Sequence, residues 1–307
     1  MNIGILSLFI LLTPQLIIAQ VHSPIVLDSV IRNQGYPGIN LHNYTGLLFN
    51  DIKQQATAPF KMNQKQAIHL GEFSIITAGL IVSDASIDKF ARKLRLNNQY
   101  INNASPVITQ LGGPYSFYLL GACGLYGVLG HDKRAQVTTL LATQAMITSG
   151  ILTRVGKLLT SRERPSASYN ISHEPGGEWY GMINYINYDA SNTKKPGSSY
   201  DAFPSGHTAT IFSIATVFAK MYSDKPAIPI IAYSTATLVG LSRLTEHAHW
   251  MSDVFVGAAL GYLCGNQVVN NYRKTYSLSA PAHKHKNIAL DMDYSNNQLL
   301  VGLKYKL

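Results

Sequence analysis

The stretch from Ser242 to Asp253 combines residue types that could carry out chemistry on a phosphoryl group. Its Arg243, His249 and Asp253 lie between two apolar runs. The spacing of four residues between His249 and Asp253 would put both side chains on one face of a helix. A carboxylate placed there holds the imidazole in one tautomer and leaves the other ring nitrogen free to attack. Arg243 supplies a planar set of donors that suits phosphoryl oxygens.

Two upstream stretches carry residues that complement this one. In residues 157–165 an apolar run ends in a cluster of cations that includes Lys157 and Arg164, and the proline after Arg164 predicts that the helix ends there. Residues 203–207 lead into a second apolar run. The N-terminus of the helix expected there presents free backbone N–H groups and the positive end of a dipole, which attract an anion. Gly206 lets the backbone approach that anion closely.

Helical patterns predict the elements that must position these residues. Apolar residues recur at helical spacing, or form long apolar runs, in segments 44–56, 64–84, 86–97, 115–130, 137–156, 206–222, 227–242 and 252–267. The Asn-rich residues 97–104 and the turn at 112–114 break this pattern. Residues 166–203 have no clear period and predict a long loop, and loops of that length inside a domain are usually functional. Residues 288–306 predict a short C-terminal β-hairpin.

The fold class that these patterns favour is all-α, an antiparallel helical bundle. The cations of 157–165 fall at the end of one helix, and residues 203–207 begin the next. Arg243 ends a third helix and Asp253 begins a fourth. In an up-and-down bundle all of these points lie at the same end. Topology therefore predicts one site that gathers three cations, two histidines, a carboxylate and a set of backbone N–H groups.

Composition favours an anionic substrate. The chain of 307 residues has a net charge of +9, is 46% hydrophobic and is only 13% charged. The positive charge favours phosphorylated small molecules or lipids, and nucleic acid is disfavoured because no basic run is interleaved with aromatics. The apolar runs reach the ~20 residues of a membrane span only by including polar residues, which favours a soluble or peripherally held bundle over an integral one. Cys123 and Cys264 lie inside apolar runs and predict buried free thiols.

The N-terminal segment predicts export. Residues 1–20 form an uncharged apolar leader that ends in small or polar residues, as a secretory signal peptide does, although the basic n-region is missing. An uncleaved N-terminal anchor is the alternative. We therefore expect a protein of the periplasm or cell envelope. The rest of the chain divides into an N-terminal helical region at 21–110, a catalytic core at 111–270 and a C-terminal tail at 271–307.

The three stretches together form a pattern of three motifs, Lys-x6-Arg-Pro, Pro-Ser-Gly-His and Ser-Arg-x5-His-x3-Asp. The residues that form it are Lys157, Arg164 and Pro165, then Pro204, Ser205, Gly206 and His207, then Ser242, Arg243, His249 and Asp253. This pattern resembles the signature of the type 2 phosphatidic acid phosphatase superfamily, which also contains bacterial class A acid phosphatases and vanadium haloperoxidases. The resemblance covers about 137–267 and is silent on the rest of the chain.

The resemblance implies a helical bundle of the acid phosphatase and haloperoxidase type and a mechanism. His249 would attack phosphorus and form a phosphohistidine, with Asp253 orienting its ring. His207 would protonate the leaving oxygen and then activate water. The residues that would bind the phosphoryl oxygens are Lys157, Arg164, Ser205, Gly206 and Arg243. The three cations would take the place that a metal fills elsewhere, so no metal and no other cofactor is expected.

Two other readings use the same residues. In a vanadium haloperoxidase the motifs would hold vanadate and His249 would ligate it. Chain length and the absence of an extended halide-pocket insertion favour the phosphatase. A catalytically idle envelope protein is the third reading, and the intact set of His207, His249 and Asp253 argues against it. The motifs leave the substrate open between a lipid phosphate, a polyprenyl diphosphate and a soluble monoester, and they leave the oligomeric state open.

Overall fold

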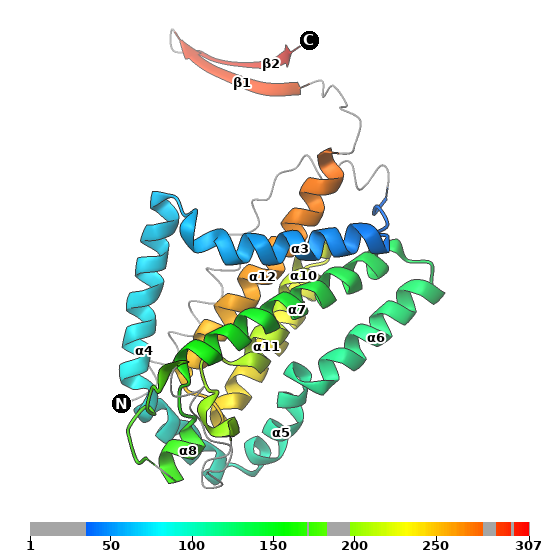
Figure 1. Cartoon of the computed structure of the whole chain (residues 1–307). Helices are drawn as coiled ribbons and strands as arrows, with labels where there is room; N and C mark the ends of the chain where they lie inside the picture. The colour runs from blue at the N-terminus through cyan, green and yellow to red at the C-terminus, as the bar shows by residue number, and fades with distance from the viewer. Residues whose placement is uncertain (1–34, 171, 183–196, 279–286, 296–297, 307) are drawn as a thin grey trace.

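The computed structural model describes residues 35–170, 172–182, 197–278, 287–295 and 298–306. Within these ranges the protein is a bundle of helices followed by one β-hairpin (Figure 1). The predicted all-α bundle is therefore confirmed. The predicted leader at 1–20 lies outside the described residues.

Four helices of the bundle run side by side, and the others pack against their sides and ends (Figure 1). The helices are α3 (Leu41–Thr57), α4 (Gln64–Asn97), α5 (Gln99–Thr109), α6 (Pro114–Leu129), α7 (Lys133–Thr160), α8 (Pro165–Asn170), α10 (Gly206–Met221), α11 (Ala227–Thr245) and α12 (Met251–Leu278). Short 3-10 turns are η1 (Ala58–Phe60), η2 (Gln110–Gly112) and η3 (Gly197–Tyr200). Helices α7, α10, α11 and α12 form the central group, α3 lies across one end of it, and α4 and α5 flank it.

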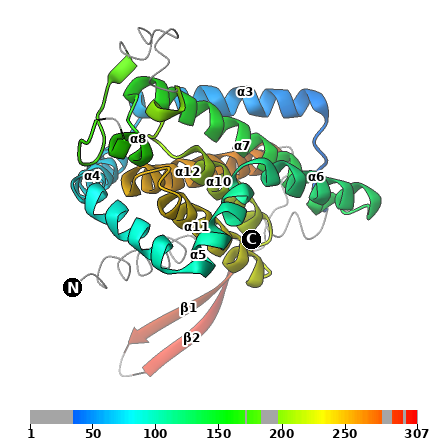
Figure 2. The ribbon, with the colours of Figure 1, turned by 90° about the horizontal axis from the view of Figure 1, so that it is seen from below.

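Helix α10 lies at the centre, with α7, α11 and α12 packed around it (Figure 2). Ile214 of α10, Leu141 of α7 and Val269 of α12 belong to one buried cluster. Ile211 of α10 packs with Val239 of α11 in a second cluster. Burying each of these side chains contributes about 1.5–3 kcal/mol to folding. This packing brings the last turns of α7 and α11 and the first turns of α10 and α12 to the same end of the bundle.

Glycines on α12 set the close approach of α12 to α10. Gly257, Gly261 and Gly265 follow one another at intervals of four residues, so they lie on one face of the helix. A Cβ atom on Gly257 would lie 2.6 Å from the carbonyl oxygen of Ser205, and one on Gly261 would lie 2.2 Å from that of Ala209. Real Cβ atoms do not approach backbone this closely. The stripe therefore places the start of α12 directly against the start of α10.

The predicted break in the Asn-rich segment 97–104 falls at the single residue Asn98, which is extended, and the rest of the segment is helical. Helix α4 runs unbroken to Asn97, and α5 begins two residues later. The side-chain oxygen of Asn98 accepts hydrogen bonds from the backbone N–H groups of Tyr100 at 3.0 Å and Ile101 at 3.3 Å. Asparagine is a preferred N-cap because its short side chain satisfies the free donors of a first turn. Asn98 therefore ends one helix and caps the next, and no loop separates the two helices.

The predicted loop at 166–203 also contains helical turns. Helix α8 occupies its beginning and η3 lies near its end. Before it, α7 ends at Thr160, earlier than predicted, because Ser161 adopts a left-handed conformation with φ 38° and its N–H bonds back to the carbonyl oxygen of Lys157. Arg164 therefore lies in the connection between α7 and α8, outside both helices.

The predicted C-terminal hairpin and free thiols are confirmed. Strands β1 (Asn287–Ser295) and β2 (Gln298–Lys306) pair antiparallel, with Asn287 opposite Lys306 and Ser295 opposite Gln298. Both cysteines are free, Cys264 buried and Cys123 half-buried.

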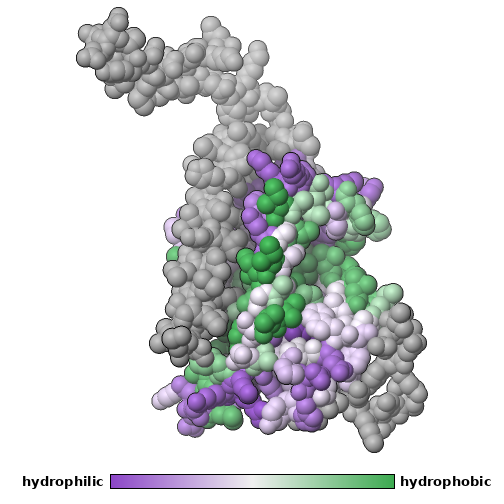
Figure 3. Space-filling view, turned by 90° about the vertical axis from the view of Figure 1, so that its left-hand side faces the viewer, coloured by the Kyte–Doolittle hydropathy of each residue, from purple (hydrophilic) through white to green (hydrophobic). Residues whose placement is uncertain are grey.

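In the part of the chain that the structure describes, two helices, α4 and α11, are long and apolar enough to cross a membrane. Only 6% of the apolar window of α4 and 33% of that of α11 is buried in the bundle. Ile75 and Val82 of α4 are 75% and 86% exposed, and Ile230 of α11 is 65% exposed. Figure 3 shows hydrophobic side chains gathered in a band across the middle of one face, with polar residues above and below it. The bundle therefore carries an apolar surface that its own fold does not cover.

The glycine stripe predicts a position-specific effect on stability. Gly261→Ala places a methyl group against the backbone of α10 and is expected to destabilise the protein by about 1–3 kcal/mol. The matched control is Gly79→Ala on α4, where a Cβ atom would meet nothing within 4 Å. That change is expected to be neutral or stabilising by up to about 1 kcal/mol, because alanine favours helix. Thermal unfolding of both variants in detergent checks the prediction, and equal midpoints would contradict it.

Candidate active site

The residues of the three motifs meet at the end of the bundle where α8 and the connecting loops lie (Figure 1). Lys157 is in the last turn of α7 and Arg243 in the last turn of α11. Ser205 is the N-cap of α10, and Asp253 is in the first turn of α12. The backbone N–H of Ser205 donates to the carbonyl oxygen of Asp253 at 3.0 Å, which ties the two helix starts together. The structure thus brings together all of the residues that the spacing predicted to meet.

His249 is almost fully buried beside Asp253. Its Nδ1 lies 3.6 Å from Asp253 Oδ2, within ion-pair range and longer than a hydrogen bond. Among the described residues none hydrogen-bonds to this Nδ1. Burial lowers the pKa of His249 well below its ordinary value, and the cations Arg164, Lys157 and Arg243 lower it further. The imidazole is therefore neutral, which is the form whose nitrogen can attack phosphorus.

Asp253 is held on both of its oxygens. Oδ2 accepts from the backbone N–H of Trp250 at 2.8 Å, and Oδ1 accepts from Arg162 at 2.7 Å. Burial raises the pKa of Asp253 to about 6, although Arg162 and the Trp250 N–H act in the opposite direction. The side chain is fully buried. These contacts leave the carboxylate one orientation, with Oδ2 toward the imidazole.

His207 is half-buried in the first turn of α10. A Cβ atom on Gly113 would lie 2.9 Å from its Nε2, so the turn before α6 makes room for this ring. Burial lowers the pKa of His207 to about 4, with further lowering by Arg243, Lys157 and Arg164. His207 is therefore neutral at pH 7. An anion among these cations would offset their effect and favour the protonated ring.

Lys157 and Arg164 share one carboxylate that the sequence analysis did not single out. Asp201 Oδ2 lies 3.1 Å from Lys157 Nζ, and Asp201 Oδ1 accepts from Arg164 Nε at 2.7 Å. Burial alone would raise the pKa of Asp201, but the two cations outweigh it and hold the pKa below its ordinary value. Asp201 thus balances the positive charge of the site. The signal available in the sequence was its place four residues before Ser205.

Arg243 is held by two further residues that the motifs do not contain. Its NH1 donates to Thr109 Oγ1 of α5 at 2.5 Å and to Glu246 Oε2 at 2.6 Å. Its Nε is buried and has no hydrogen-bond partner among the described residues. The guanidinium therefore has one N–H donor, on Nε, to which no described residue bonds.

The start of α10 offers backbone donors. Ser205 is fully buried, and its hydroxyl lies 2.9 Å from that of Thr208. No side chain caps the first turn, so its backbone N–H groups are available to an anion. A Cβ atom on Gly206 would make ordinary contacts with Thr153 and Lys157, so the protein itself does not require glycine there. Among the described residues, no group of three His, Cys, Asp or Glu side chains could hold a metal ion.

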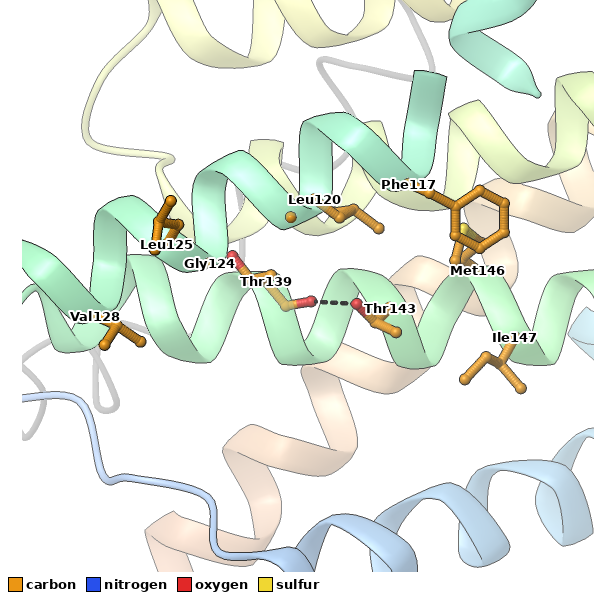
Figure 4. A pocket seen from close by; sticks show the side chains of 10 residues that line it. Phe117, Leu120, Gly124, Leu125, Val128, Thr139, Thr143, Met146 and Ile147 are labelled. Atoms are coloured by element: carbon orange, nitrogen blue, oxygen red, sulfur yellow. Dashed lines mark hydrogen bonds between the residues drawn. The ribbon is translucent and has the colours of Figure 1, made fainter. Parts of the chain in front are cut away.

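An apolar groove between α6 and α7 begins near this site (Figure 4). Phe117 at its near end is one helical turn from Gly113, which packs against His207. The groove runs from there along α6 to Val128. Its lining is almost entirely apolar: Phe117, Leu120, Gly121, Gly124, Leu125, Val128, Thr139, Thr143, Met146 and Ile147. The hydroxyl of Thr143 is turned back to the carbonyl oxygen of Thr139 at 2.9 Å, so it offers no free donor to the groove.

The part of the chain that carries the three motifs matches a protein-family model. Residues 138–276 match the model of the PAP2 superfamily. That segment includes all of the motif residues and spans most of α7 and all of α10 and α11. The chain therefore contains a PAP2 superfamily domain, and the resemblance inferred from the motifs is confirmed.

Curated relatives match shorter parts of the chain. It is 40% identical over 86 residues to lipid A 1-phosphatase of Porphyromonas gingivalis, covering 28% of this chain and 19% of that protein. It is 29% identical over 161 residues to lipid phosphate phosphatase 1 of Arabidopsis thaliana, covering 48% of this chain and 46% of that protein. The chain thus spans less than half of the length of either relative.

Two solved structures are similar to the chain. The crystal structure of Aquifex aeolicus LpxE has a TM-score of 0.44 and 23% identity, covering 61% of this chain and 94% of that one. That of a transmembrane PAP2 type phosphatidylglycerolphosphate phosphatase from Bacillus subtilis has a TM-score of 0.43 and 20% identity, covering 78% and 98%.

The contacts of Asp201 predict how the site binds an anion. An oxyanion at Lys157 and Arg164 must compete with this carboxylate, so Asp201→Asn is expected to lower the Kd for sulfate about tenfold, or about 1.4 kcal/mol. Asp224→Asn is the matched control, because Asp224 pairs with Arg134 outside the site. Isothermal titration of both variants checks the prediction. Weaker sulfate binding by Asp201→Asn would mean that Asp201 holds the cations in place for the anion.

Proposed function

We propose that the protein is a phosphatase that hydrolyses lipid phosphates or diphosphates without a metal. The observation that carries the proposal is a buried, neutral His249 set between Asp253 and the cations of the site. A nucleophile in that position faces an oxyanion whose charge the cations hold through the transition state. The names of the curated relatives support the same reaction class.

In the first step of this proposal, His249 Nε2 attacks phosphorus in line with the leaving oxygen. The N–P bond forms while the P–O bond to the alcohol or phosphate leaving group breaks, and protonated His207 gives its proton to that oxygen. Nδ1–H of His249 faces Asp253, whose charge stabilises the ring as it becomes cationic. Lys157, Arg164 and the N–H groups at the start of α10 bind the other phosphoryl oxygens.

In the second step, water attacks the phosphohistidine. His207, now neutral, takes a proton from that water, the N–P bond breaks and inorganic phosphate forms. The low pKa of His207 suits its second role as a base. The negative charge of the bound substrate would raise that pKa and so favour the protonated ring that the first step needs. His207 thus alternates between acid and base as the charge beside it changes.

The apolar surfaces favour a lipid substrate over a soluble monoester. One end of the groove between α6 and α7 is at Phe117, one helical turn from the Gly113 that packs against His207, so the groove can accept a hydrocarbon chain while the phosphate lies among the cations. The exposed apolar faces of α4 and α11 favour association with a membrane, where such substrates reside. We propose membrane association in place of the soluble bundle that composition favoured. Location outside the cytoplasm stays a prediction of the leader sequence.

The reaction predicts a loss of activity in His249→Ala. Phosphate release from a detergent-dispersed lipid phosphate in EDTA is expected to fall at least about 1,000-fold, because the nucleophile is gone. His69→Ala is the control, because His69 is an exposed histidine of α4 that pairs with Glu72. Abolition of wild-type activity by EDTA, with rescue by a divalent ion, would contradict metal independence. Absence of phosphate release together with bromide-dependent halogenation after vanadate loading would place the chain with the haloperoxidases.

The groove predicts substrate preference. Gly124→Leu puts a large side chain into its lining and is expected to raise KM for a long-chain lipid phosphate about tenfold. KM for a soluble aryl phosphate should stay unchanged, since that substrate reaches the cations without the groove. Steady-state kinetics on both substrates checks this. An equal change for the two substrates would contradict a role for the groove.

The low pKa of His207 predicts that anion binding takes up a proton. Sulfate keeps its charge between about pH 5 and about pH 8. In this range its Kd should rise with pH by up to about tenfold per unit as long as the pH lies between the pKa of free His207, about 4, and the higher pKa of the bound state. The sign follows from protonation: bound sulfate raises the pKa of His207, so low pH favours the complex. In His207→Gln this proton-linked part of the slope should disappear. An unchanged slope in that variant would assign the proton to another group.

A further inference from the structure

Arg162 lies between two carboxylates beneath the site. It is fully buried, as are Asp84 and Asp253. Its NH1 donates to Asp253 Oδ1 at 2.7 Å, and its NH2 donates to Asp84 Oδ2 at 2.6 Å. Asp253 belongs to the third motif, whereas Asp84 comes from α4, before the segment that matches the PAP2 superfamily. One guanidinium therefore joins the N-terminal region to the carboxylate beside His249.

Ser252 completes the connection between Asp84 and Arg162. Its backbone N–H donates to Asp84 Oδ1 at 2.9 Å, and its hydroxyl bonds to Asp84 Oδ2. The same hydroxyl accepts from Arg162 NH1 at 2.6 Å. Asp84 thus receives donors on both oxygens and has one orientation. The first turn of α12, which carries Asp253, is bound to α4 through this carboxylate.

Two indole rings enclose the guanidinium. The ring of Trp179 lies 4.4 Å from the Arg162 Cζ atom, and that of Trp250 lies 5.4 Å from it. The carbonyl oxygen of Gly176 accepts from Arg162 NH2 at 2.7 Å. Stacking on aromatic faces and bidentate pairing are properties of arginine that lysine does not reproduce. The position is therefore built for a guanidinium.

The charge balance of the cluster explains why Arg162 pairs with two carboxylates, Asp84 and Asp253. Arg162 alone would neutralise Asp253 and weaken its attraction for a cationic imidazole. Because Asp84 already balances the guanidinium, the two carboxylates and one guanidinium carry a net charge of −1 toward His249. Removing one partner of such a buried group leaves an uncompensated charge, which destabilises the charged groups that remain.

We propose that Asp84 and Arg162 are positioning residues that hold Asp253 against His249 while the phosphoryl group is transferred. The proposal rests on the phosphatase function proposed above. Neither residue touches substrate, and no bond to either is made or broken. Their part is to fix the orientation and the charge of Asp253 as Nδ1–H of His249 becomes positive. The proposal also means that α4, which lies outside the segment matched to the PAP2 superfamily, helps to position a group of the reaction.

Asp84→Asn tests this inference in the full-length protein. It keeps the shape of the side chain and removes its charge, and kcat for aryl phosphate is expected to fall about 10- to 100-fold with KM changed less than about threefold. Asp88→Asn is the matched control, because Asp88 lies one turn further along α4 and pairs with His247 outside the cluster. That variant should keep at least about half of wild-type kcat. Wild-type kinetics in Asp84→Asn would overturn the proposal.

A double-mutant cycle separates positioning from general stability. If Asp84 acts through Asp253, Asp84→Asn should cost less than about twofold in kcat when Asp253 is already asparagine. A loss that multiplies fully with that of Asp253→Asn would overturn the proposal. Sulfate binding by each variant, expected to be unchanged, shows that the site is folded.

Arginine and serine variants extend the test. Arg162→Lys should lose at least as much kcat as Asp84→Asn, because lysine cannot bond both carboxylates. Should Asp84→Asn not fold, Ser252→Ala removes one hydroxyl from the same cluster and should lower kcat about threefold to tenfold at unchanged KM. Full activity in Ser252→Ala and Arg162→Lys would also overturn the inference. A wild-type protein without turnover would instead refute the proposed function.

Discussion

The gathering of positive charge at one end of the bundle is the constraint on which the rest of the site depends. Lys157, Arg164 and Arg243 converge where water is largely excluded, and like charges in such surroundings repel strongly. Asp201 balances two of them, and Glu246 pairs with the third. Burial lowers the pKa of both His207 and His249, and the same cations lower it further, so both rings stay neutral. An incoming phosphate therefore meets cations that are already positioned and whose present partners it can replace.

The site is also held by residues that lie outside the segment matched to the PAP2 superfamily. Asp84 reaches it from α4 and Thr109 from α5, both before the part of the chain that matches the PAP2 superfamily. Each contacts a charged side chain whose position the proposed chemistry requires. The N-terminal helices thus complete the site as well as enlarging the bundle. The same helix α4 presents its other side chains outward, so one element serves the polar site and the apolar surface.

Close packing of the helices sets where the polar site and the apolar groove lie relative to each other. The glycines of α12 let its first turn lie against the first turn of α10, which sets Asp253 beside Ser205. The turn at Gly113 lets α6 begin beside His207, and the groove along α6 begins one helical turn further on, at Phe117. A hydrocarbon chain and its phosphate can therefore be bound by adjoining parts of one bundle.

The sequence by itself determined the helices of the bundle, the motif residues and their meeting at one end, because helical periodicity and the alternation of helix direction are local properties. It did not reveal that Asn98 caps a new helix directly after the break, since asparagine also favours turns. Asp84, Arg162 and Asp201 were decided only by the tertiary structure. The only signal for Asp201 in the sequence was its place four residues before Ser205, and nothing in their spacing marks Asp84 and Arg162. The partners of all three come from other helices and loops, so only the folded chain brings these groups together.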